Sequence, residues 1–218
     1  LFAVYGIIAV GAVFALSATP IDEQQADEAC GFAPTLGLLR QPFVLLAFCG
    51  ILCHVGIDVG TNTTAPRLLM EYAGHSLETA SFATSIYFVC RTLGCLLGSG
   101  LLRRFQPRSI LAVSACLMLA ALVGLLTLRT ETALYVCIGL IGLGNSNVFP
   151  IIFAQALRRN PRQANAVSAL MIMGLIGGTI FPLLMGAASD AIGQQGAVAV
   201  MLVAAIYLCF FQSRIGRC

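Results

Sequence analysis

Long apolar segments separated by short polar or charged stretches dominate the chain. Each segment is long enough to cross the roughly 30 Å hydrocarbon core of a bilayer as a helix. The pattern predicts an all-α membrane protein with seven transmembrane helices. The expected spans are residues 1–18, 43–70, 77–102, 109–128, 133–157, 164–188 and 196–212.

The composition agrees with a membrane protein. Hydrophobic residues make up 59% of the chain and charged residues only 10%, with a mean hydropathy of +0.93, whereas soluble domains carry about 25% charged residues. Most of the nine cysteines lie inside apolar segments, where a thiol behaves as a small apolar side chain. We therefore expect neither a disulfide scaffold nor a metal site.

Residues 19–41 interrupt the apolar pattern with acidic residues, prolines and glycines, which predict a linker without a continuous helix. One span before this linker and six after it indicate one half of a larger two-part bundle. The expected parts are the end of an N-terminal half (1–18), a cytoplasmic linker (19–41), a six-helix bundle (42–213) and a cytoplasmic tail (214–218). Because the chain begins inside an apolar run without a Met, we expect Leu1 not to be the natural N-terminus.

The arginines predict the orientation of the bundle in the membrane. Positive charge near helix ends marks the cytoplasmic side, and the chain has no lysine. Seven alternating spans place nine of the twelve arginines on one side, while Arg129 and Arg67 fall on the other and Arg91 lies inside a span. The nine are Arg40, Arg103, Arg104, Arg108, Arg158, Arg159, Arg162, Arg214 and Arg217.

Three polar residues are predicted to lie near the middle of the membrane. Counting back from Arg103 and Arg158 at the predicted cytoplasmic boundary, Arg91 lies roughly 18 Å deep, Asn147 roughly 16 Å and Asn145 roughly 20 Å, at about 1.5 Å per residue. An ionisable residue at such a depth indicates a functional site. The two amides point to different faces of their helix, so we expect at most one to meet a ligand, and depth favours Asn147.

Further polar candidates share one helix face. His54, Asp58 and Asn62 follow one another at four-residue spacing, so the stripe is expected to point inward rather than toward lipid. Two interpretations remain open: a hydrogen-bonded network that only holds helices together, or a ligand site. Arg91 could pair with Asp58 or a helix-end carbonyl, or use its donors on a hydroxyl-rich ligand, and Tyr87 could supply an aromatic wall beside a ring-shaped substrate.

Glycines and prolines predict irregular helices in two spans. The segment GLGNSNVFP, which ends at Pro150, is expected to loosen the fifth span, as the helices around transporter sites often are. In the sixth span, Gly177, Gly178 and Pro182 predict a hinge or kink.

Motifs for other chemistry are missing from the sequence. It contains no phosphate-binding glycine loop, no nucleophile elbow and no histidine–glutamate metal motif. We expect no enzymatic activity, no cofactor and no metal. Membrane topology accounts for the arginines, so nucleic-acid binding is not expected either.

Three segments resemble sugar transporters of the major facilitator superfamily, and most of all the fucose:proton symporter family. They are SIYFVCRTLGCLLGSGLLRRFQP, NSNVFPIIFAQALRR and GLIGGTIFPLLMGAASDAIG, and the resemblance runs through nearly all of residues 42–213. The first also resembles the loop that follows the eighth helix of superfamily members, with its usual acidic position lost. The resemblance implies that residues 1–18 are the sixth helix and 19–41 the central linker, with helices seven to twelve following.

The resemblance also implies a function. We expect a twelve-helix transporter of the inner (cytoplasmic) membrane that works by alternating access and moves a fucose-, glucose- or galactose-type monosaccharide together with a proton. In the fucose symporter the carboxylates credited with coupling belong to the N-terminal half, which is an expected partner of this bundle together with the lipid bilayer. Two alternatives remain: a drug or organic-anion exporter in which Arg91 binds a carboxylate, and a non-transporting membrane sensor.

Overall fold

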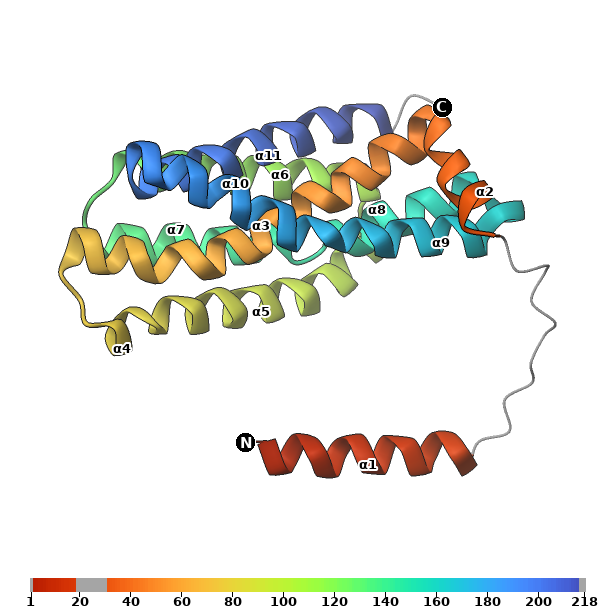
Figure 1. The fold of residues 1–218 in the computed structure, drawn as a ribbon, viewed down its shortest axis with the longest axis horizontal. Helices are drawn as coiled ribbons and strands as arrows, with labels where there is room; N and C mark the ends of the chain where they lie inside the picture. The colour runs from red at the N-terminus through yellow and green to blue at the C-terminus, as the bar shows by residue number, and fades with distance from the viewer. Residues whose placement is uncertain (1, 19–30, 216–218) are drawn as a thin grey trace. The chain divides into compact units, whose positions relative to one another are not determined.

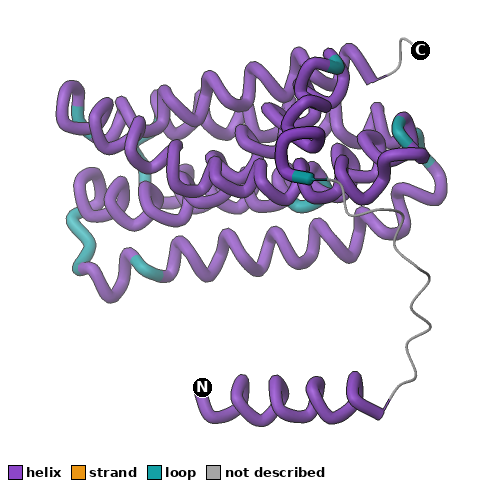
Figure 2. Tube along the Cα trace, turned by 45° about the vertical axis from the view of Figure 1, so that its right-hand side comes forward, coloured by secondary structure: helices purple, strands orange, loops and turns teal. Residues whose placement is uncertain are grey.

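The computed structural model describes residues 2–18 and 31–215, and this part of the chain consists of helices joined by short turns (Figures 1 and 2). The chain divides into two units, residues 1–31 and 32–218. The first unit contains α1 (Phe2–Ala18), an apolar helix of 17 residues that corresponds to the first predicted span. Residues 19–30 of the predicted linker lie outside the described residues.

The second unit contains six stretches that are long and apolar enough to cross a membrane. They lie side by side as a helical bundle (Figure 1), which agrees with the predicted six-span bundle. The six stretches consist of α3 (Pro42–Ala73), α4 (Leu77–Ala80) with α5 (Phe82–Arg104), α6 (Pro107–Thr127), α7 (Glu131–Asn145) with α8 (Val148–Arg159), α9 (Ala164–Met173) with α10 (Gly177–Ile192), and α11 (Gln194–Ile215).

The end of the predicted linker is more ordered than the sequence indicated. Phe32–Gly37 forms the short helix α2, and Leu38–Arg40 continues it as one turn of 3-10 helix. Pro34 is the third residue of α2, where its missing N–H has no helical carbonyl to bond. Thr35 and Leu38 are buried, so this segment packs as part of the bundle.

Pro66 lies inside the second predicted span, and it does not end the helix. Helix α3 continues through this proline to Ala73 and ends at Gly74, whose φ of 68° allows the left-handed cap. Ala65 and Leu68 on either side of the proline are buried. Packing against neighbouring helices is one way in which membrane helices tolerate an internal proline.

The two spans that were predicted to be irregular are both interrupted. In the fifth, α7 ends at Asn145 and α8 begins at Val148. Pro150 follows in the first turn of α8, where a proline breaks no helical bond. In the sixth, one turn of 3-10 helix at Gly174–Ile176 separates α9 from α10, just before the glycines that were expected to bend it. Pro182 lies inside α10 without ending it.

Small residues bring α3 and α10 into close contact. A Cβ atom on Gly177 would collide with the backbone carbonyl of Leu52, which cannot move aside as a side chain can. Gly186, on the same helix, has no atom within 4 Å of the corresponding position. The two glycines therefore offer a matched comparison of a packed and an open position.

We predict that Gly177→Ala lowers the stability of the bundle, because overpacking of this kind costs about 1–3 kcal/mol. Gly186→Ala should leave stability unchanged or raise it, by up to roughly 1 kcal/mol, because alanine is the better helix former. Thermal unfolding of the two purified variants in detergent measures the difference. Equal melting temperatures would contradict the close packing of α3 against α10.

Candidate functional site

An ion pair joins α3 to α5 inside the bundle. Nη1 of Arg91 donates to both carboxylate oxygens of Asp58, at 2.6 Å to Oδ1 and 2.7 Å to Oδ2. Both residues lie well inside their helices, far from either helix end. The structure therefore gives Arg91 a partner from among the alternatives that the sequence left open.

Three further side chains extend this pair into a network that includes α7. The hydroxyl of Tyr87 donates to Asp58 Oδ1 at 2.5 Å, and Asn145 Nδ2 donates to that hydroxyl at 3.0 Å. His54 Nδ1 lies 2.7 Å from Asn145 Oδ1. Two of the three stripe residues of α3 thus contact the same cluster.

The hydrogen bonds of the network all run in one direction. An amide oxygen only accepts, so Nδ1 of His54 carries the proton toward Asn145. Asn145 then donates to Tyr87, and Tyr87 donates to Asp58, which as a carboxylate only accepts. The series of hydrogen bonds from His54 therefore ends at the carboxylate of Asp58, to which Arg91 also donates.

The two ends of the network differ in exposure. His54, Tyr87 and Asn145 are 2%, 0% and 0% exposed, whereas the side chains of Arg91 and Asp58 are 28% and 19% exposed. Only the ion pair can therefore meet a ligand without a rearrangement. The ring of Tyr87 presents no open face, so in this structure its hydroxyl contributes to the site and the predicted aromatic wall is not available.

The remaining two candidates lie apart from the network. Asn62 donates to the backbone carbonyl of Asp58 at 2.9 Å, and its own Oδ1 is buried without a hydrogen-bond partner. Asn147 donates to the carbonyl of Gly94 and to Ser146 Oγ, both at 2.8 Å, and so bonds α5 to the α7–α8 junction. Of the two amides, Asn145 joins the network and Asn147 does not, and the predicted binding role of either remains a prediction.

Asn147 lies against two glycines of α5, a contact that its place in the sequence did not indicate. A Cβ on Gly98 would collide with the Asn147 amide, and one on Gly94 would lie 2.5 Å from Ser146 Oγ. The four-residue spacing of these glycines predicts a close helix contact, but it does not identify the side chain that fills it. Among the described residues, no group of three or more His, Cys, Asp or Glu side chains is placed to hold a metal ion.

We predict that Asp58 and Arg91 stabilise the bundle as a unit. Asp58→Asn alone should lower the unfolding free energy by about 1–3 kcal/mol, because it leaves a partly buried guanidinium without its charged acceptor. Arg91→Gln alone should lower the unfolding free energy by a similar amount, because it leaves the carboxylate of Asp58 without its charged donor. The double variant should recover part of the lost stability. Thermal unfolding of the four proteins measures the interaction energy, and strictly additive losses would contradict a direct pair.

A transmembrane helical bundle with a charged, hydrogen-bonded network at its centre defines a polytopic membrane protein with an internal polar site. The family model described as the Major Facilitator Superfamily matches residues 1–165 and, in a second alignment, residues 46–214. The chain belongs to this superfamily.

Curated relatives give a more detailed comparison. The chain is 26% identical over 201 residues to a protein named glucose/galactose transporter in Brucella abortus biovar 1 (strain 9-941), covering 91% of this chain and 48% of the relative. It is 30% identical over 150 residues to the L-fucose-proton symporter of Escherichia coli (strain K12), and this match covers 62% of this chain and 32% of the symporter. The chain thus spans at most about half the length of these relatives.

A solved structure shows the same fold. The bundle matches the crystal structure of a Major Facilitator Superfamily transporter, FucP, in the outward conformation, with a TM-score of 0.82 and 21% sequence identity. The match covers 97% of this chain and 52% of that one. The predicted architecture, one half of a superfamily transporter, is confirmed.

Proposed function

We propose that the chain is the C-terminal half of a secondary transporter that moves a monosaccharide, together with a proton, across the cytoplasmic membrane by alternating access. Superfamily membership and relatives named for glucose/galactose transport and fucose–proton symport support this proposal. The N-terminal half would complete the central cavity.

The observation that carries the proposal is the partly exposed Arg91–Asp58 pair. A sugar presents adjacent hydroxyls, each of which can donate one hydrogen bond and accept others. Asp58 offers oxygens that accept, and Arg91 has guanidinium donors that are not used on Asp58. A hydroxyl pair can therefore bind both residues at once, while the buried members of the network hold Asp58 in place.

The same pair argues against an exporter of organic anions. An anion would need an uncompensated positive charge, and in this structure the charge of Arg91 is neutralised by Asp58 at hydrogen-bond distance. A neutral polyol meets no such obstacle. The non-transporting sensor differs from the transporter only in flux, so an experiment must separate these two.

We expect the full-length protein that contains residues 1–218 to accumulate radiolabelled glucose, galactose or fucose in vesicles with an imposed proton gradient. A protonophore should abolish the accumulation. Efflux of an anion in place of sugar uptake would establish the exporter. Saturable sugar binding without flux would establish the sensor.

We predict that Arg91→Gln weakens sugar binding at least about tenfold, because a hydrogen bond to a charged group contributes roughly 1.5–3 kcal/mol. Arg129→Gln is the matched control, since Arg129 stacks on Tyr72 away from the network. Equilibrium binding of labelled sugar to membranes containing equal amounts of each variant measures the effect. Unchanged binding by Arg91→Gln would remove this residue from the site.

A further inference from the structure

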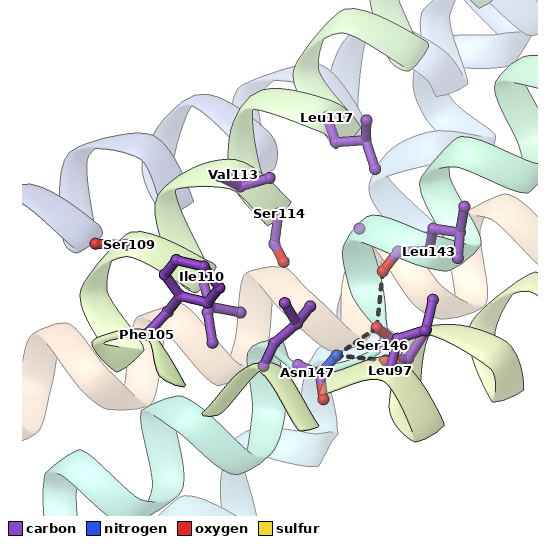
Figure 3. Close-up of a pocket in the computed structure, with 13 residues that line it drawn as sticks. Leu97, Phe105, Ser109, Ile110, Val113, Ser114, Leu117, Leu143, Ser146 and Asn147 are labelled. Carbon is purple, nitrogen blue, oxygen red and sulfur yellow. Dashed lines mark hydrogen bonds between the residues drawn. The ribbon is translucent and has the colours of Figure 1, made fainter. Parts of the chain in front are cut away.

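A groove separates two helices that follow one another in the sequence. α5 and α6 each pack extensively against α7 and hardly against each other. The groove between them has a volume of about 300 Å³ (Figure 3), within the roughly 300–1,000 Å³ that small-molecule pockets occupy. In Figure 3, Val113 and Leu117 lie on the α6 side, across from Ser146 and Asn147 at the end of α7.

The inside of the groove suits an apolar occupant. Leu97 and Leu101 line it from α5, and Ile110 and Val113 line it from α6. On its floor, Ser146 Oγ donates to the carbonyl of Leu143 at 2.7 Å and accepts from Asn147 Nδ2 (Figure 3). In a membrane such a groove opens to hydrocarbon, and its mostly apolar lining suits an acyl chain.

One end of the groove is strongly basic. Phe105, in the loop that joins α5 to α6, and Ser109, in the first turn of α6, line this end. Three exposed arginines flank the loop, Arg103 and Arg104 at the end of α5 and Arg108 at the start of α6, and none of them has an ion-pair partner among the described residues. The sequence contains no acidic residue between positions 79 and 130 that could neutralise them.

The start of α6 adds to this positive end. Its first turn has no side-chain cap, so the positive end of the helix dipole faces the same loop. A second cluster of arginines, at residues 158–162, differs from this one. There, Arg159 already donates to the carbonyl of Ile215 at 3.0 Å and lies over the ring of Phe43. One of the three arginines at residues 158–162 therefore already has partners, whereas none of the three beside the groove has an ion-pair partner among the described residues.

We propose that this groove is a binding site for an anionic phospholipid of the leaflet at the predicted cytoplasmic face. One acyl chain lies between α5 and α6 along Leu97, Leu101 and Val113, and the phosphate contacts Arg103, Arg104 and Arg108. Charge selects the headgroup, because each arginine near a membrane surface favours an anionic lipid by an increment that a zwitterionic lipid does not receive. The groove holds the acyl chain, which a basic loop on its own would not bind.

Native mass spectrometry of the purified full-length protein, titrated with phosphatidylglycerol or phosphatidylcholine, tests the site. We expect phosphatidylglycerol to bind more tightly. The triple variant Arg103→Gln/Arg104→Gln/Arg108→Gln should weaken it about tenfold or more, on the basis of the gain per arginine at a membrane surface. The control variant Arg158→Gln/Arg162→Gln/Arg214→Gln removes the same charge from the same predicted face and should keep the affinity of the unmodified protein.

A second pair of variants tests the groove apart from the charge. Val113→Trp fills the groove and should weaken phosphatidylglycerol binding, whereas Val123→Trp, further along α6 and outside the groove, should not. Equal loss in both arginine triples would show only a general attraction to the basic face and would overturn the proposal. So would equal affinity for the two lipids, or no binding because the N-terminal half covers the groove.

Discussion

The high cost of placing a charge inside a bilayer is the constraint on which the rest of this structure depends. Inside apolar transmembrane helices, Arg91 and Asp58 are tolerable only as a pair, and the pair requires α3 and α5 to stay adjacent. α7 enforces this arrangement from a third side. A Cβ on Gly142 would lie 2.5 Å from the backbone oxygen of Tyr87, so the glycine allows α7 to approach α5 closely enough for Asn145 to reach the tyrosine hydroxyl.

Because α7 and α8 are separated by a turn, Asn145 and Asn147 can hydrogen-bond to different partners although they are close in the sequence. Asn145 is the last residue of α7 and points into the network, where it bonds to both His54 and Tyr87. Asn147 lies beyond the end of the helix and bonds to the backbone of Gly94. In a regular helix both side chains would lie on faces fixed by the helical period, whereas the two-residue turn frees the second amide to hold α5.

Much of the fold could be predicted from the sequence, because twenty-residue apolar segments have few alternatives in a membrane. The polar candidates followed from the same physics, since a polar group in lipid must find a partner. Which partners they find could not be predicted: the choice between Asn145 and Asn147 depends on a local turn rather than on depth. How the helix tolerates Pro66 could not be predicted either, because Ala65 and Leu68 are buried by helices that are distant in the sequence.

Helix α5 links the network and the lipid groove physically. Gly94 lies one turn beyond Arg91, and it both lines the groove and accepts the hydrogen bond from Asn147. The same close contact therefore shapes the floor of the groove and sets the distance between α5 and α7 on which the Tyr87–Asn145 bond depends. The arginines of the α5–α6 loop lie outside this contact. Removing their charge should change which lipid headgroups bind at the groove and leave the contact between α5 and α7 intact. Headgroup recognition and the polar site can therefore be separated experimentally, even though both involve α5.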